Sequence, residues 1–184
     1  MTTDKTKTFD LSTSFKAYDV RGIVGQSITA EIVEAVGAAF VDVLELTGQT
    51  VLVGGDMRPS SPEFAKAFAN GAATRGANVQ LLDLISTDEL YYACGALNAA
   101  GATFTASHNP AEYNGIKMAK AGAVPISSET GLMEIQARAE EYLNAGAIPA
   151  AGSTGLIGVQ DVLKGYAEYL RSLVDLRGSR PLKV

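Results

Sequence analysis

The chain has 184 residues, of which 47% are hydrophobic and 19% charged, a balance typical of a globular domain and not of a disordered chain. Its formal net charge of −5 argues against a nucleic-acid-binding protein, which needs a basic surface. The single cysteine, Cys94, excludes a disulfide framework or a cysteine zinc site within the chain, and its apolar neighbours predict a core position. The polar N-terminus has no apolar signal core, and no apolar run is long enough to span a membrane. We therefore expect a cytoplasmic protein without a membrane partner.

The first third of the chain alternates between strand and helix patterns. Residues 1–14 are polar and predict a flexible lead-in. A strand-like segment over 15–25 follows, and apolar residues at helical spacing then predict a helix between Thr29 and Gly48. Residues 50–53 are β-branched and predict a short strand.

A turn-rich loop follows that strand over residues 54–59. It carries both charge signs, and we expect Asp56 and Arg58 to form an ion pair that holds the loop. Ser61 is the predicted N-cap of the next helix and Pro62 its first residue.

The middle of the chain predicts the centre of a sheet. Residues 78–85 form the next predicted strand, and a short helix separates it from the strand at 101–106, which is small, β-branched, aromatic and uncharged. Residues 115–119 return after a loop that is too short for a helical crossover. They are therefore predicted to run antiparallel to 101–106.

The last third predicts two more helices. One ends near Gly146, where a connector rich in glycine, alanine and proline begins and runs over 146–158. The other helix carries Tyr166 and Tyr169 on an apolar stripe, which predicts that both rings lie in a core.

Strands that alternate with amphipathic helices predict a three-layer α/β/α domain with a mixed, largely parallel sheet. We expect this domain to cover residues 15–160, with residues 161–178 as a C-terminal helix that leads out of it. Residues 179–184 resemble the start of a further strand, so they are interpreted as the truncated beginning of a second domain.

The candidate functional loop leaves the predicted strand at 101–106 and carries Ser107, His108 and Asn109, with Lys117 shortly beyond it. Loops at the carboxyl ends of strands form the ligand crevice of open α/β sheets. A hydroxyl, an imidazole, a carboxamide and an ammonium group in this short stretch indicate a site for anionic chemistry.

Two other classes of site are disfavoured by what the sequence lacks. A serine hydrolase would need a second histidine or a Gly-x-Ser-x-Gly turn, and the chain has one histidine and no such turn. A dinucleotide site would need Gly-x-Gly-x-x-Gly between a strand and a helix, which is also missing.

Three motifs occur in order along the chain: FKAYDVRG at residues 15–22, GGDMRPSSP at 54–62, and TASHNP at 105–110 with NGIK at 114–117. Together they resemble the first domain, domain I, of the α-D-phosphohexomutases, the phosphomannomutase and phosphoglucomutase family. The resemblance covers about residues 15–175.

The resemblance implies a role for each candidate residue. It makes Ser107 the phosphoserine, whose phosphate also ligates Mg²⁺ while the other metal ligands lie outside this chain. It assigns catalytic roles to Ser107, Lys117, Arg21 and His108, and substrate-binding roles to Tyr18, Arg21, Asn109 and Lys117. Judged from the residues alone, Arg21 can instead form a plain ion pair with Asp19 or Asp56.

The resemblance also implies an activity. Enzymes of this family interconvert hexose 6-phosphates and hexose 1-phosphates of mannose or glucose, with hexose 1,6-bisphosphate as activator. The family has four domains around a cleft, so the remaining domains of the parent enzyme are expected partners, and this chain alone is expected to be inactive.

Two alternatives stay open: a phosphoglucosamine mutase domain, or a non-catalytic domain that binds sugar phosphates. Two positions also depart from the family pattern, since Gly55 replaces a usual basic residue and Ala106 a common glycine.

Overall fold

The computed structural model describes residues 8–175, 177, 178 and 180. In this part of the chain the strands are β1 (Val20–Ile23), β2 (Thr50–Gly55), β3 (Asn78–Leu84), β4 (Ala100–Phe104), β5 (Tyr113–Lys120), β6 (Val124–Pro125) and β7 (Ile157–Val159). The helices described are α1 (Ala30–Val43), α2 (Ser61–Thr74), α3 (Thr87–Ala96), α4 (Leu132–Ala145) and α5 (Leu163–Leu173).

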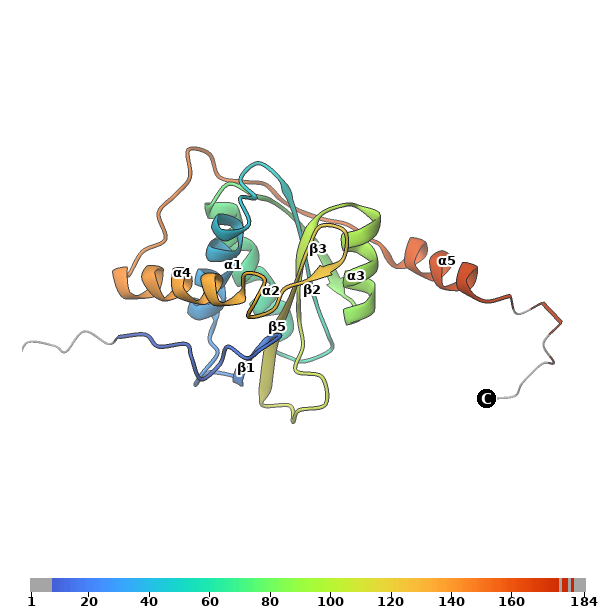
Figure 1. Cartoon of the computed structure of the whole chain (residues 1–184), viewed down its shortest axis with the longest axis horizontal. Coiled ribbons are helices and arrows are strands. Elements are labelled where there is room, and N and C mark those ends of the chain that lie inside the picture. The colour runs from blue at the N-terminus through green and yellow to red at the C-terminus, as the bar shows by residue number, and fades with distance from the viewer. Residues whose placement is uncertain (1–7, 176, 179, 181–184) are drawn as a thin grey trace, which may run out of the picture.

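These strands form one sheet in the order β1-β5-β4-β2-β3-β7, with β6 paired to β5. Helices α1, α2 and α4 cover one face of the sheet and α3 covers the other, so the predicted three-layer α/β/α architecture is confirmed (Figure 1). The sheet is mixed: β2 pairs parallel with β3 and β4, and β3 with β7. Strand β5 is antiparallel to β4, as its short connecting loop predicted.

Aromatic rings link the helices of the larger core to the centre of the sheet. Phe40 of α1 contacts Phe68 of α2 with ring centroids 5.4 Å apart, and Phe68 lies 6.0 Å from Phe104 of β4. On the other face, α3 buries Cys94 fully, which confirms its predicted core position. Burial raises the pKa of the Cys94 thiol to about 12.

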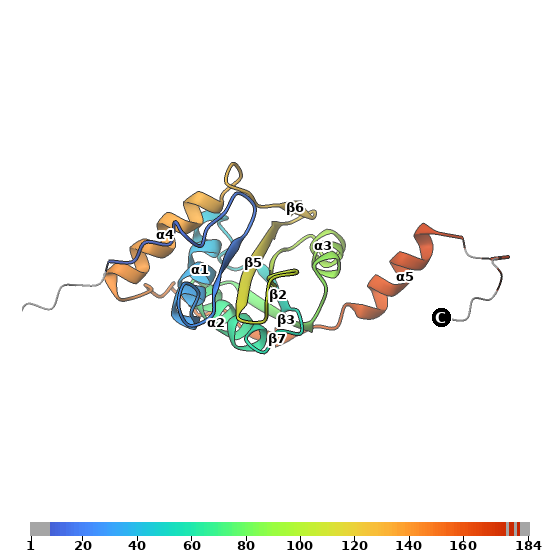
Figure 2. The same ribbon diagram turned by 90° about the horizontal axis from the view of Figure 1, so that it is seen from below.

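The prediction that residues 1–14 form a flexible lead-in is wrong for residues 8–14, which pack against the domain. This segment runs beside α4 (Figure 2), where the Leu11 N–H donates to the Glu140 carboxylate at 2.7 Å. The Leu11 side chain is 3% exposed and belongs to the larger core. Apolar residues such as Phe9 and Leu11 stand singly between polar ones, so they gave no periodic signal, although they pack against the larger core. Residues 1–7 lie outside the described part of the chain.

The predicted connector over 146–158 is wrong at its end, where β7 forms. A strand of three residues is too short to show a period, so its sequence pattern could not reveal it. The preceding helix, α4, ends at Gly146 as predicted, with Gly146 in the left-handed conformation at φ 69°.

Helix α5 extends away from the sheet and its covering helices (Figures 1 and 2). No residue of α5 is buried, and Tyr169 is 47% exposed, so the predicted core position of the two tyrosines is wrong. Their rings instead contact Tyr92 of α3, with centroids 5.6 Å from Tyr166 and 5.4 Å from Tyr169. The predicted strand start at 179–184 lies outside the described residues, apart from Arg180. None of the described helices has the length and hydropathy needed to cross a membrane.

Helices α1 and α2 approach each other closely at Gly71, where an added Cβ would lie 1.9 Å from the carbonyl oxygen of Glu34. We predict that Gly71→Ala lowers the free energy of unfolding by about 1–3 kcal/mol, because backbone must move apart to admit the methyl group. Urea denaturation measures this change.

The matched control is Gly95→Ala in α3, where the nearest atom to the new Cβ is 3.7 Å away. This exchange has room for the methyl group and gains up to about 1 kcal/mol of helix propensity. A Gly71→Ala variant as stable as the Gly95→Ala variant would contradict the close packing of the two helices.

Candidate active site

Ser107 lies on the loop between β4 and β5, at the sheet edge where β2 and β4 both end. The residue is exposed and has φ 53°, in the left-handed region, which costs a serine about 1–2 kcal/mol. Its N–H donates to the Thr105 hydroxyl at 3.0 Å. Such a conformation persists only where neighbouring contacts impose it.

Arg21 and Lys117 meet on one face of the sheet. Arg21 pairs across the ladder with Gly115, and Lys117 lies two residues further along β5, so both side chains point to the same side. Asp19 joins them: its Oδ2 accepts from Arg21 Nη2 at 2.6 Å and from Lys117 Nζ at 3.3 Å. The possible Arg21–Asp19 pair is therefore confirmed. The link from Asp19 to Lys117 was missed, because it depends on the register of β1 against β5.

Arg21 also connects this cluster to the Ser107 loop, because its Nη1 donates to Asn109 Oδ1 at 2.6 Å. Its Nε is buried and has no hydrogen-bond partner among the described residues. Arg21 thus keeps a donor that an added oxyanion could take. The structure brings four residues together: Asp19, Arg21, Asn109 and Lys117.

Gly115 allows β1, β4 and β5 to meet at this point. A Cβ at Gly115 would lie 2.2 Å from the Val20 carbonyl oxygen and 2.9 Å from that of Thr105. No larger residue fits without moving the strands, so Gly115 fixes the approach of Arg21 to the serine loop.

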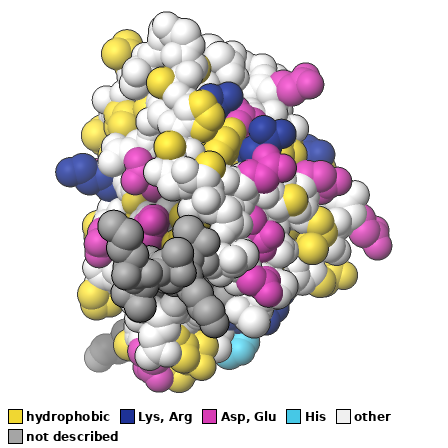
Figure 3. Space-filling model, turned by 90° about the vertical axis from the view of Figure 1, so that its left-hand side faces the viewer, with side chains coloured by type: hydrophobic (Ala, Val, Ile, Leu, Met, Phe, Trp, Pro, Cys, Tyr) yellow, Lys and Arg dark blue, Asp and Glu magenta, His cyan; other side chains and the backbone are white. Residues whose placement is uncertain are grey.

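His108 and Tyr18 lie at the surface. The Ser107 hydroxyl is 3.4 Å from His108 Nδ1, at the outer limit of a hydrogen bond. The single histidine side chain is visible at the surface in Figure 3, on a face where acidic and basic groups are interspersed. Tyr18 is 74% exposed. The catalytic role of His108 and the substrate-binding role of Tyr18 stay predictions.

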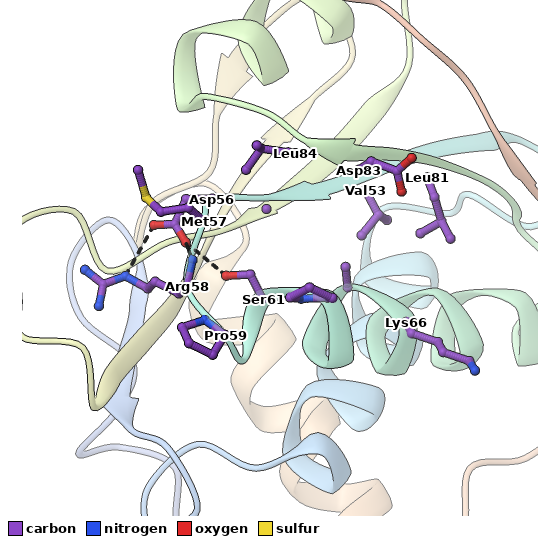
Figure 4. Close-up of a pocket in the computed structure, with 13 residues that line it drawn as sticks. Val53, Asp56, Met57, Arg58, Pro59, Ser61, Lys66, Leu81, Asp83 and Leu84 are labelled. Carbon is purple, nitrogen blue, oxygen red and sulfur yellow. Dashed lines mark hydrogen bonds and ion pairs between the residues drawn. The ribbon is translucent and has the colours of Figure 1, made fainter.

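The loop after β2 contains the expected ion pair: Arg58 Nε lies 3.3 Å from Asp56 Oδ2. Asp56 stands between this guanidinium and the Ser61 hydroxyl, which donates to it at 3.0 Å (Figure 4). The predicted cap is therefore displaced, since Ser60 is the N-cap of α2 and Ser61 serves Asp56. A side chain at Gly55 would crowd Ser61, with 2.8 Å between the two Cβ atoms.

A pocket of about 420 Å³ lies beside this loop, at the ends of β2 and β3 (Figure 4). Its lining is largely apolar and includes Val53, Met57, Pro62, Leu81 and Leu84. None of the six predicted site residues lines it. The cluster around Asp19 and the Ser107 loop, and not this pocket, is therefore the candidate active site.

A metal ion finds no ready-made protein site in the described part of the chain. No group of three or more His, Cys, Asp or Glu side chains there could hold one. The described residues alone do not fit a Mg²⁺ site, and a phosphate on Ser107 is the one ligand that the prediction places within this chain.

Fold and site together define an α/β/α domain that presents a strained, exposed serine on a loop tied to a pair of cationic side chains. The family model described as phosphoglucomutase/phosphomannomutase, alpha/beta/alpha domain I, matches residues 12–145. The chain therefore belongs to the phosphoglucomutase/phosphomannomutase family, of which it contains domain I. This confirms the resemblance carried by the three motifs.

Individual relatives agree with this assignment. A phosphomannomutase of Escherichia coli is 40% identical over 174 residues, which cover 94% of this chain and 37% of the relative. A phosphomannomutase of Klebsiella pneumoniae is 42% identical over 130 residues, or 70% of this chain and 82% of the relative. The crystal structure of a phosphoglucomutase/phosphomannomutase family protein from Burkholderia thailandensis matches 94% of this chain and 38% of its own, with a TM-score of 0.78 and 29% identity. The chain thus spans little more than a third of the first relative's length.

Asp19→Asn removes the carboxylate that separates Arg21 from Lys117. We predict a loss of about 1–2 kcal/mol in the free energy of unfolding, between the values for exposed and buried ion pairs. We also predict that inorganic phosphate raises the unfolding midpoint of this variant more than that of the unchanged protein, because an oxyanion can replace the carboxylate between the two cations. Thermal unfolding with and without phosphate measures both effects.

The control is Asp175→Asn, which breaks an exposed pair with Arg177. It should change stability by less than about 0.5 kcal/mol and give no extra response to phosphate. An equal phosphate response in both variants and the unchanged protein would mean that the Asp19 cluster is not an anion site.

Proposed function

We propose that this chain is the phosphoserine-bearing domain I of a phosphohexomutase of the phosphomannomutase/phosphoglucomutase type. The parent enzyme interconverts hexose 6-phosphate and hexose 1-phosphate, and a hexose 1,6-bisphosphate acts as intermediate and activator. The observation that carries the proposal is the exposed, strained Ser107 on a loop that Asn109 ties to Arg21. The relatives from Escherichia coli and Klebsiella pneumoniae, both named phosphomannomutase, support it.

The proposed chemistry is a phosphoryl transfer between Ser107 and a sugar hydroxyl. The bond from Ser107 Oγ to phosphorus breaks as a bond from the sugar oxygen to phosphorus forms; the sugar hydroxyl gives up its proton and Ser107 Oγ takes one up. A phosphoserine carries about −1.5 to −2 charges near neutral pH, so the transfer requires positive charge around the phosphoryl oxygens and an in-line approach.

Arg21 and Lys117 would supply that charge. Their shared partner Asp19 holds them side by side in the absence of substrate, and the unpaired Nε of Arg21 gives a donor for a phosphoryl oxygen. Lys117 or His108 would exchange the proton with the sugar hydroxyl, and Tyr18 and Asn109 would line the sugar site. Mg²⁺, when bound to the phosphate, would add positive charge.

The sugar is proposed to be mannose or glucose, following the names of the relatives and of the family, with glucosamine as the alternative. We propose a cytoplasmic location, where such sugar phosphates are found. The further Mg²⁺ ligands and the rest of the sugar site are proposed to belong to other domains of the parent enzyme, since this chain covers 37% of the Escherichia coli relative.

A chimera tests the proposal in the setting it describes. This chain replaces the matching 174-residue segment of the Escherichia coli phosphomannomutase, and conversion of mannose 1-phosphate to mannose 6-phosphate is followed. We predict turnover in the chimera and a loss of at least about 1,000-fold in its Ser107→Ala variant, because no other group would carry the phosphoryl.

Ser153→Ala, which removes an exposed serine hydroxyl from a loop far along the chain, should leave the turnover unchanged. A folded chimera without turnover would favour the non-catalytic sugar-phosphate-binding alternative. A Ser107→Ala chimera that turns over normally would rule out Ser107 as the carrier.

The 184-residue chain by itself should have no detectable mutase turnover at protein concentrations where the chimera is active. It has one wall of the proposed cleft, and its described residues hold no metal cluster. The same assay measures this, and sustained turnover by the chain alone would refute the need for further domains.

A further inference from the structure

Arg58 lies in the loop between β2 and α2, and its position is fixed from within that loop. Its backbone N–H donates to Asp56 Oδ1 at 3.0 Å, and its Nε donates to Asp56 Oδ2 at 3.3 Å. Asp56 is itself anchored to β4, since its N–H donates to the Phe104 carbonyl at 2.8 Å. The guanidinium is therefore held by the parallel pair β2–β4, on which both loops of the site begin.

The other four N–H donors of the Arg58 guanidinium cross to the serine loop. They bind carbonyl oxygens at 2.8–2.9 Å: Nη2 binds those of Ser107 and Asn109, and Nη1 those of Pro110 and Tyr113. With the Asp56 bond, all five donors of the guanidinium are used. The side chain is 9% exposed. Arg58 thus has no donor left for a substrate and acts on the loop instead, unlike Arg21.

These contacts decide which groups of the loop face outward. A trans peptide places the carbonyl of one residue and the N–H of the next on opposite sides. Because Arg58 binds the carbonyls of Ser107 and Pro110, the N–H groups of His108 and Ala111 point away from it. Neither N–H donates a hydrogen bond within the described part of the chain.

This orientation suits an anion on Ser107. Carbonyl oxygens repel a phosphoryl group and N–H groups attract it, so a loop that carries a dianion must turn its carbonyls away. Arg58 gathers four such oxygens on its own side while the Ser107 hydroxyl stays exposed. The same contacts explain how a serine is kept at φ 53°.

We propose that Arg58 is the positioning residue of the Ser107 loop: its fully engaged guanidinium holds the loop in the one conformation that presents the hydroxyl and outward N–H groups to a phosphoryl group. The effect on phosphoryl transfer rests on the proposed function of Ser107, whereas the effect on loop order stands without it.

Arg58→Lys separates geometry from charge. A lysine keeps the positive charge but has three donors on a single nitrogen, which cannot reach four carbonyls and a carboxylate together. The matched control is Arg75→Lys, because Arg75 also binds a carboxylate, Asp42 at 2.7 Å, and a carbonyl, that of Pro149, without touching the serine loop.

The first measurement is amide hydrogen exchange of the 184-residue chain. The bonds from the Asn109 N–H to Ala106 and from the Tyr113 N–H to Pro110 report on the loop. We expect Arg58→Lys to speed exchange of residues 105–113 by at least about tenfold while α4 keeps its protection, and Arg75→Lys to leave the loop unchanged.

The second measurement uses the chimera. We expect Arg58→Lys to lower kcat by about 100-fold with KM little changed, because a misplaced carrier slows transfer without weakening substrate binding. Unchanged loop exchange together with unchanged kcat would overturn the proposal, and so would loss of protection throughout the domain, which would make Arg58 a general stabilising residue. If Ser107→Ala stays active while Arg58→Lys still loosens the loop, the carrier role fails and the loop role stands.

Discussion

The parallel pairing of β2 with β4 is the constraint on which the candidate site depends. It brings two loops that are about 50 residues apart in sequence to one edge of the sheet, where the guanidinium of Arg58 joins them through four hydrogen bonds to carbonyl oxygens of the serine loop. Without that pairing, neither the strained conformation of Ser107 nor the inward direction of the loop carbonyls would be maintained. The serine loop over residues 105–112 is mostly small and polar and contains Asn109 and Pro110, so it has little order of its own and must be ordered by contacts from other elements.

Two arginines near the serine loop use their hydrogen-bond donors differently. Every N–H donor of the Arg58 guanidinium binds an oxygen of the protein, and the side chain is nearly buried. Its positive charge therefore holds oxygens of the two loops together. Arg21 donates from Nη2 to Asp19 and from Nη1 to Asn109, and its Nε has no hydrogen-bond partner among the described residues. Arg58 therefore acts as a scaffold, whereas Arg21 keeps donors that the proposed function assigns to a phosphoryl group.

Sequence patterns predicted the architecture and placed Ser107 on a loop after a strand, because strand and helix periods and turn dipeptides are local. They led through the motifs to the proposed roles of Ser107, Arg21 and Lys117, and they predicted the Asp56–Arg58 pair. They could not predict the four carbonyl contacts of Arg58, since backbone oxygens are not encoded in residue type, nor the bridge by Asp19, which needs the register of β1 against β5. The apolar stripe of α5 predicted burial that the structure does not show. An apolar helix face indicates that a second surface is needed to bury it, and the described residues of this chain cover little of this helix.

The central claim is that the Ser107 hydroxyl, on the loop that Arg58 holds and that Asn109 ties to Arg21, carries the phosphoryl group. The most direct test is to mix the chimera with hexose 1,6-bisphosphate bearing a labelled phosphate, quench within one turnover and map the label by peptide mass spectrometry. Label on Ser107, and nowhere else in residues 8–175, is the predicted result. Label on another residue, or a chimera that turns over without any labelled intermediate, would contradict the claim.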